Sequence, residues 1–136
     1  LMLACNGYCL AEIAFEHALA YSKERSAFGR PIGKFQTIRH KLADMATAVA
    51  TAKAFTYQCA ARMANGEHIP AEIAMAKNHA SDVARHVCWD AVQIFGGMGY
   101  MRETIVERLA RDARLLPIGG GTQEIMKEII AKRLDF

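Results

Sequence analysis

Hydrophobic positions recur every three to four residues over most of the chain, which is the spacing of one face of an α-helix. One such segment covers residues 1–23 and a second covers residues 37–65. A third begins near Pro70, a good first-turn residue, and is stopped by the glycines that start at Gly96. The spacing therefore predicts three long amphipathic helices.

Two shorter helices are expected in the rest of the chain. One covers residues 104–113, and the last starts where Thr122 can cap it, with Ile125, Ile129, Ile130 and Leu134 on its apolar side. No segment shows the alternating pattern of a strand. Three long helices and a fourth, joined by short loops, predict an all-α fold, an antiparallel up-down four-helix bundle that forms one domain over residues 1–136.

The expected apolar face of each long helix follows from the same spacing. On the first helix it consists of Leu3, Leu10, Ala14, His17 and Tyr21. On the second it consists of Ile38, Leu42, Met45, Val49, Ala52, Phe55, Cys59 and Met63. On the third it consists of Ile73, Ala76, Ala80, Val83, Val87, Ala91 and Ile94.

Composition narrows the class of protein. Hydrophobic residues make up 52% and charged residues 23% of the 136 residues, the usual balance of a globular domain. No apolar run approaches the roughly 20 residues that a membrane span needs. The net charge of +3 is too mild to indicate nucleic-acid binding. No signal-peptide pattern is present, so secretion is not expected.

The sequence gives little support for a metal site or a reactive thiol. Cys5, Cys9, Cys59 and Cys88 form no C-x-x-C pair and are interpreted as free thiols, with Cys5 and Cys9 as core filler. No Glu-x-x-His spacing of a di-iron bundle occurs, and His79 and His86 are interpreted as surface or satisfied core histidines. We therefore expect no metal site.

Two glycine-rich segments invite a functional interpretation. Gly96, Gly97 and Gly99 follow a helix, whereas a dinucleotide-binding fingerprint opens one, so a Rossmann fold is not predicted. Residues 119–122, three glycines and Thr122, precede a helix instead. Bare backbone amides there favour an anion or a carbonyl oxygen, although a flexible connection has the same composition.

Two longer segments carry a family resemblance. The first is residues 21–36, YSKERSAFGRPIGKFQ, and the second is residues 93–103, QIFGGMGYMRE, continuing to Arg108 and to residues 111–114. With the tail at residues 118–132, they resemble the C-terminal domain of the flavin-dependent acyl-CoA dehydrogenases, especially the long-chain and isovaleryl-type members. The resemblance covers nearly the whole chain, which corresponds to the last portion of a family protein.

The resemblance implies a function for the whole protein. Family members oxidise an acyl-CoA to the trans-2-enoyl-CoA in fatty acid β-oxidation: a glutamate takes the α-proton and the β-hydride passes to N5 of FAD. An electron-transferring flavoprotein then accepts the electrons. The implied assembly is a homodimer or a dimer of dimers, a homotetramer. The implied location is the cytoplasm of a bacterium or the mitochondrial matrix of a eukaryote.

The same resemblance assigns cofactor contacts. Arg25 corresponds to an arginine that meets the FAD pyrophosphate, which suits a guanidinium because it forks onto two phosphate oxygens. Phe28 corresponds to a ring near the adenine, and a neighbouring subunit completes that end of the cofactor. The other FAD-binding residues implied by the resemblance are Gln36, Gln93, Ile94, Phe95, Gly96, Gly97, Thr122, Gln123 and Glu124.

The catalytic base is the main departure from the family pattern. Many members have a glutamate at the position of Gly120, where glycine has no proton-accepting group. Long-chain and isovaleryl-type members place their glutamate at the start of the first helix, which here falls just upstream of Leu1. Gly120 and Gly121 would then line the thioester end of the acyl pocket. Glu12 and Glu16 lie several turns away and are interpreted as solvated.

Other interpretations stay open. The residues allow an acyl-CoA oxidase-like flavoprotein, or a bundle that serves only assembly. Arg111, Asp112 and Arg114 are interpreted as structural ion pairs near a contact surface and not as a catalytic cluster. Because the base and the rest of the family architecture lie outside it, the isolated chain is expected to be inactive.

Overall fold

The computed structural model describes residues 1–135 and consists almost wholly of helices. The long ones are α1 (Met2–Glu24), α2 (Gln36–Ala64) and α3 (Pro70–Phe95), and the short ones are α4 (Ile105–Ala113) and α5 (Gln123–Arg133). Two 3-10 helices, η1 (Ile32–Lys34) and η2 (Gly96–Tyr100), lie in the connections. The all-α class expected from the sequence is confirmed.

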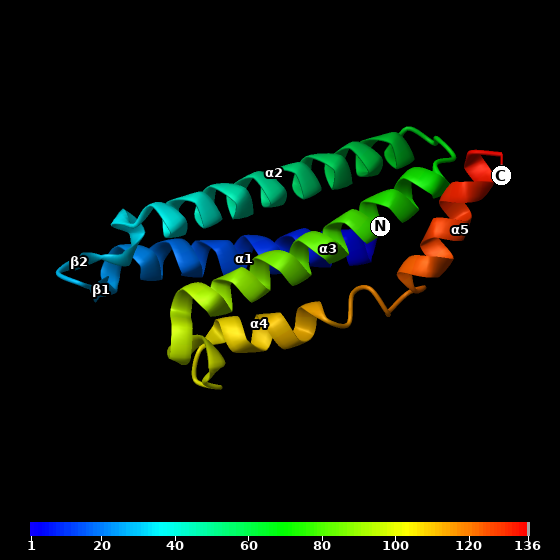
Figure 1. Ribbon diagram of the computed structural model, residues 1–136. Helices are drawn as coiled ribbons and strands as arrows, with labels where there is room; N and C mark the ends of the chain where they lie inside the picture. The colour runs from blue at the N-terminus through cyan, green and yellow to red at the C-terminus, as the bar shows by residue number, and fades with distance from the viewer. Residues whose placement is uncertain (136) are drawn as a thin grey trace.

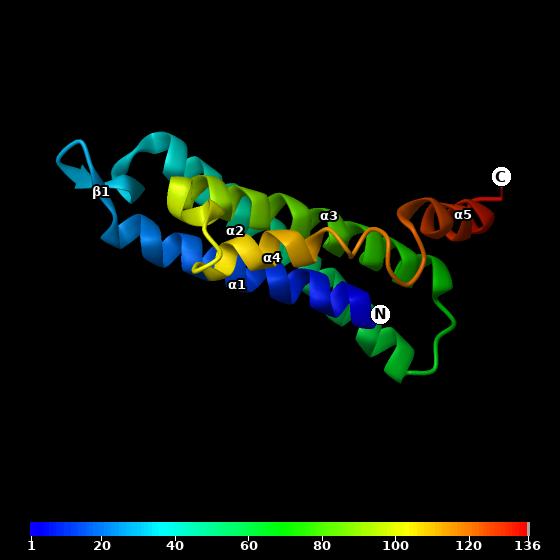
Figure 2. The same cartoon turned by 90° about the horizontal axis from the view of Figure 1, so that it is seen from below.

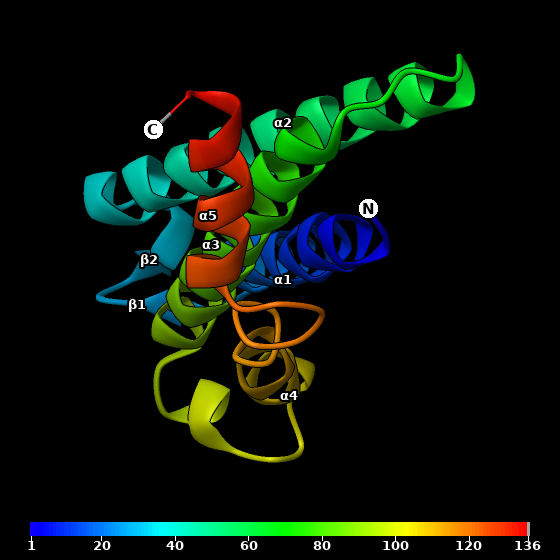
Figure 3. The same cartoon turned by 90° about the vertical axis from the view of Figure 1, so that its right-hand side faces the viewer.

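The helices α1 to α4 run back and forth along the long axis of the molecule (Figure 1). α3 is the central element, since it packs against each of the other four α-helices. Seen from below, α4 lies alongside α1 (Figure 2), and these two helices are also in contact. α5 packs on the N-terminal part of α3 and stands apart from α4, as the end-on view shows (Figure 3).

Local signals set the helix boundaries. Pro70 occupies the first turn of α3, where its missing N–H costs nothing, and Gly96 ends that helix with a φ of +60°. α2 ends before Asn65 and Gly66, and the φ of Gly66 is +81°. Thr122 caps α5, its Oγ1 accepting a hydrogen bond from the amide of Ile125 at 3.4 Å. Each of these proline, glycine and threonine boundary signals can be recognised in the sequence.

The interface between α1 and α3 is built from small residues. The buried positions on α1 include Ala4, Gly7, Ala11, Ala14 and Ala18. A Cβ placed on Gly7 would lie 2.7 Å from the carbonyl oxygen of Ala80 on α3, so the two backbones approach closely.

The expectation that His17 faces the core is wrong, because this side chain is exposed. Ala14 and Ala18 are both fully buried. At 3.6 residues per turn, Ala14 and Ala18 lie about 40° apart around α1, whereas residue 17 lies about 60° from Ala14 and about 100° from Ala18, off the contact line. The core of this interface therefore consists of alanines, and larger residues such as Leu3, Leu10 and Tyr21 pack only partly against it.

A small hairpin joins α1 to α2, which the sequence analysis missed. β1 (Ser26–Ala27) pairs antiparallel with β2 (Arg30–Pro31). Strands of two residues are too short to show alternation, which explains the omission. Phe28 and Gly29, at the turn, have φ values of +52° and +79°. Positive φ at both central residues is typical of a tight hairpin turn.

Candidate functional site

The hairpin presents two of the predicted cofactor residues to solvent. Phe28 is 96% exposed. Its φ is positive, which is uncommon for a residue other than glycine. Its ring meets Phe35 edge to face with 6.2 Å between the centroids, and the Arg30 guanidinium lies 4.2 Å from the centroid of Phe35. Arg25, the residue that ends α1, is also exposed. The end of α1 and the hairpin thus offer an exposed guanidinium and an exposed aromatic ring at one end of the bundle.

The end of α3 lies beside this hairpin. Tyr21 in the last turns of α1 stacks on Phe95 in the last turn of α3, with 4.1 Å between the ring centroids. Gly96 and Gly97 are exposed, and a Cβ on either would meet nothing within 4 Å. Because the chain around these glycines is open, a ligand can approach the backbone closely.

Side chains of residues 93–95 divide between solvent and core. Gln93 is exposed and free to contact a ligand, whereas Ile94 is 5% exposed and belongs to the hydrophobic core. Ile94 can therefore contact a cofactor through its backbone only.

Gly99 is required for packing, since a Cβ there would lie 2.5 Å from the carbonyl oxygen of Val92.

Gln36 lies in a polar groove between α2 and α3. Asp90, which is 7% exposed, bridges Lys41 of α2 and His86 of its own helix. The groove is lined by Gln36, Thr37, His40, Lys41, Asp44, His86 and Asp90. Gln36 therefore shares its surroundings with Lys41, which is paired with Asp90, and with a second carboxylate, Asp44, so the lining does not by itself select an anionic ligand.

The glycine loop before α5 forms a second group of predicted site residues. Gly120 and Gly121 have φ values of +62° and +102°, a region that side-chain-bearing residues rarely adopt. A Cβ on Gly120 would meet Cδ1 of Leu3 at 2.2 Å. The start of α1 and residue 120 are therefore direct neighbours. This is required if a glutamate at the start of α1 is to replace one at residue 120.

Helix α3 holds this loop with three polar side chains that the sequence analysis did not single out. Lys77 Nζ donates to the carbonyl oxygen of Gly121 at 2.7 Å, and Asn78 Nδ2 donates to that of Gln123 at 3.1 Å. Gln123 Nε2 in turn donates to Asp82 Oδ1 at 2.8 Å. The sequence gives one signal for Lys77, which lies at helical spacing between the apolar positions Ile73 and Ala80. A lysine in a sequence is ordinarily assigned to the surface, so this signal was not used.

Burial and hydrogen bonding shift the charges around the loop. Lys77 is 3% exposed, and burial lowers the pKa of its ammonium. Hydrogen bonding to its own backbone amide, and secondly to Thr122, lowers the pKa of the Glu124 carboxyl. Glu124 thus stays ionised at the start of α5, where a negative charge is favourable, and is a poor proton acceptor.

The two groups of predicted residues lie at opposite ends of α3. The loop meets α3 at Lys77 and Asn78, whereas the last turns of α1, which lead into the hairpin, meet α3 at Phe95 through Tyr21. A separation of 17 residues along a helix corresponds to about 25 Å. The structure therefore does not bring Arg25, Phe28 and Gly96 together with Thr122 and Glu124 within one chain.

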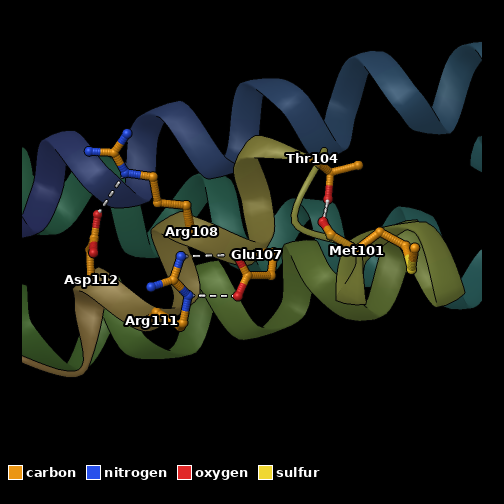
Figure 4. Close-up of polar contacts among 6 residues, drawn as sticks. All are labelled: Met101, Thr104, Glu107, Arg108, Arg111 and Asp112. Carbon is orange, nitrogen blue, oxygen red and sulfur yellow. Dashed lines mark hydrogen bonds and ion pairs between the residues drawn. The ribbon is translucent and has the colours of Figure 1, made fainter.

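Several acidic residues elsewhere are engaged in ion pairs. Glu12, interpreted as solvated, is half-buried and accepts from Lys53 Nζ of α2 at 2.8 Å. On α4, Arg111 pairs with Glu107 at 2.6 Å and Arg108 pairs with Asp112 at 3.4 Å (Figure 4). Hydrogen bonding to Arg111 lowers the pKa of the Glu107 carboxyl. These ion pairs stabilise α4. Because their carboxylates are paired with arginines, they are poor candidates for the catalytic base.

The histidines and cysteines do not converge on a metal. His79 and His86 are both exposed, and Cys9 is exposed on α1, so its interpretation as core filler is wrong. Within residues 1–135 no group of three or more His, Cys, Asp or Glu side chains is arranged to hold a metal ion. In the same range no helix is both long and apolar enough to cross a bilayer.

Comparison with known sequences identifies relatives over the whole described chain. The family model "Acyl-CoA dehydrogenase, C-terminal domain" matches residues 1–135. An acyl-CoA dehydrogenase of Bacillus subtilis is 47% identical over 132 residues, which are 97% of this chain and 35% of that protein. The caffeyl-CoA reductase-Etf complex subunit CarC of Acetobacterium woodii is 40% identical over 97% of this chain and 35% of its own length.

Solved structures show the same fold. A probable acyl-CoA dehydrogenase from Mycobacterium abscessus has a TM-score of 0.96 and 50% identity over 97% of this chain and 35% of that one. The butyryl-CoA dehydrogenase of Megasphaera elsdenii has a TM-score of 0.96 and 40% identity over 98% of this chain and 35% of its own. The chain thus spans about a third of the length of the proteins it matches.

Proposed function

The chain belongs to the acyl-CoA dehydrogenase family, as a C-terminal domain, and we propose that the protein containing it oxidises an acyl-CoA to the trans-2-enoyl-CoA with FAD. The observation that carries the proposal is the end of the bundle near the hairpin. There the end of α1 and the end of α3 are joined by the Tyr21–Phe95 stack, and this end carries an exposed guanidinium, an exposed aromatic ring and an open glycine backbone.

The residues at that end fit FAD by their chemistry. Arg25 is free to pair with a pyrophosphate, and Phe28 is free to pack against a planar base. Gln93, Gly96 and Gly97 offer a side-chain amide and accessible backbone groups. When bound, FAD supplies the acceptor for the β-hydride of the acyl chain.

The second group of residues serves the other part of the site. Thr122, Gln123 and Glu124 stand at the N-terminus of α5, where backbone amides and an ionised carboxylate offer hydrogen bonds. Because about 25 Å separates them from the hairpin along α3, we propose that the two groups bind different FAD molecules in a homo-oligomer. Each cofactor would then be held by two subunits, in a dimer or a dimer of dimers.

The proposed base is a glutamate just upstream of Leu1. Gly120 provides no proton acceptor, but its contact with Leu3 places the loop against the start of α1. A carboxylate that precedes Leu1 would therefore lie close to the glycine loop. Gly120 and Gly121 would line the thioester end of the acyl pocket, and the base would remove the α-proton.

An electron-transferring flavoprotein is the proposed electron acceptor. CarC is named as a subunit of a complex with an Etf. The same name describes a reductase, so the family includes proteins named for the opposite direction of the reaction. We favour oxidation here because the Bacillus and Megasphaera relatives are named as dehydrogenases.

The full-length protein allows a direct test of this function. Under anaerobic conditions, acyl-CoAs of graded length and branching are added to the purified protein, and the visible absorbance of its flavin is followed. Bleaching by one chain class supports the proposal. A flavin that stays oxidised with every thioester contradicts it, and a protein that cannot be loaded with FAD supports the assembly-only alternative. Rapid reoxidation by oxygen after bleaching would favour the oxidase alternative.

The location of the base gives a second test. Replacing the expected upstream glutamate with glutamine should lower kcat by about 10²- to 10⁴-fold, the usual contribution of general base catalysis. In that background the pair Leu3→Ala and Gly120→Glu restores a carboxylate beside the loop; the smaller residue 3 removes the clash, while the strain of a side chain at a φ of +62° stays and limits the recovery. We expect partial recovery of kcat. No carboxylate upstream, or no loss in the glutamine variant, would contradict the assignment.

A further inference from the structure

Lys77 is a buried cation that belongs neither to the proposed cofactor contacts nor to the proposed base. It lies on the core side of α3 and is 3% exposed. Its ammonium donates to one neutral acceptor, the carbonyl oxygen of Gly121, at 2.7 Å. The carboxylates of Glu124 and Asp82 act on it only through space. A lysine in this position therefore pays desolvation without a directly paired counter-charge.

Packing alone does not account for a lysine here. Positions around it on the same stripe of α3 are filled by Ile73, Ala76 and Ala80. A methionine would fill the same volume without burying a charge, and buried charges without pairing are rare for that reason. The ammonium is therefore expected to serve the group it contacts, which is the loop before α5.

That loop depends on outside contacts for its conformation. Gly120 and Gly121 both have positive φ, and glycine loses more conformational freedom on ordering than any other residue. The amide of Gln123 bonds the carbonyl of Pro117, and Asn78 holds the carbonyl of Gln123. Within residues 1–135, Lys77 is the only side chain that bonds the backbone of the two positive-φ glycines.

We propose that Lys77 is a positioning residue for acyl-CoA oxidation: its ammonium fixes the Gly121 carbonyl and so orients the glycine loop at the thioester end of the acyl pocket. The inference rests on the proposed function. Small displacements of a group that positions a substrate have large effects on rate, since about 1 Å can cost 10²-fold. The same hydrogen bond also polarises the peptide between Gly121 and Thr122.

The test uses Lys77→Met in the full-length protein, with Lys127→Met as the matched control. Lys127 is exposed on α5, so its replacement removes the same charge without touching the loop backbone. We expect kcat per bound flavin to fall about 10- to 100-fold in Lys77→Met, with a smaller change in KM, and to stay unchanged in the control. Amide hydrogen exchange of residues 119–122 should become faster in Lys77→Met only.

Lys77→Arg separates positioning from simple packing, since it keeps a cationic donor at this site. It should recover part of kcat and of the exchange protection, and it provides the test if Lys77→Met does not fold. A wild-type kcat in Lys77→Met, or equal losses in the Met and Arg variants, would overturn the positioning role. A wild-type flavin that no acyl-CoA bleaches would instead overturn the proposed function, and the role of Lys77 would fall with it.

Discussion

Single residues differ sharply in how far their environment alters their chemistry. Lys77 and Cys88 are both buried on α3, and in both cases burial disfavours the charged form of the side chain. Neither shift was visible in the sequence, because a sequence gives the residue type but not the surface that covers it. From the sequence, Cys88 was interpreted as a free thiol without being placed in the core, and Lys77 was not singled out.

Cys88 allows a test at this scale. Burial, with a smaller effect from the charge of Asp112, raises the pKa of its thiol to about 12. Because the thiolate is the nucleophile, Cys88 should resist alkylation by iodoacetamide at pH 8 in the native protein and react after unfolding in urea. Peptide mass spectrometry measures both rates, with the exposed Cys9 as the comparison. Equal rates at Cys88 in native and unfolded protein would contradict its burial.

At the scale of elements, the helix boundaries were predictable and the packing was only partly so. Pro70, Gly66 and Gly96 mark chain breaks by their backbone chemistry alone, which needs no knowledge of neighbours. The hairpin at residues 26–31 was missed because two-residue strands carry no periodicity. The close approach of α1 to α3 was missed because a row of alanines reads as weakly hydrophobic and not as a contact surface.

Gly7 gives the element-scale prediction. A Cβ at this position meets the carbonyl of Ala80 at 2.7 Å, so Gly7→Val should force α1 away from α3. Overpacking of this kind typically costs about 1–3 kcal/mol of unfolding free energy. Asn6→Val is the matched control, because residue 6 is exposed on the same helix. Urea unfolding of the full-length variants measures both, and equal stabilities would show that the interface tolerates more volume.

At the scale of the whole molecule, the candidate site divides into two parts. The sequence predicted its residues one by one, but it gave no sign that α3 holds them at opposite ends. Tyr21 and Phe95 place the hairpin at the C-terminal end of α3, and Lys77 and Asn78 place the loop near its N-terminal part. That separation depends on the fold and could not be read from spacing along the chain. It is the structural reason for proposing a cofactor shared between subunits.

Mixed oligomers test the shared site directly. Arg25→Ala removes the guanidinium of the hairpin end, and Thr122→Ala with Glu124→Ala removes the polar groups of the α5 end, so each variant alone should lose most of its FAD. If every FAD uses the hairpin of one subunit and α5 of another, a mixed dimer contains one doubly damaged site and one intact site. Unfolding and refolding the two variants together should then restore about a quarter of the sites, from random pairing.

Flavin content and activity of the refolded mixture measure this recovery. Each variant refolded alone is the control, and both should stay inactive. If the two groups of residues served the same FAD within one subunit, every site in the mixture would carry one of the two defects and no recovery would occur. Recovery near the random-pairing value therefore requires that Arg25 and Thr122 of one chain belong to different sites, as their positions at opposite ends of α3 predict.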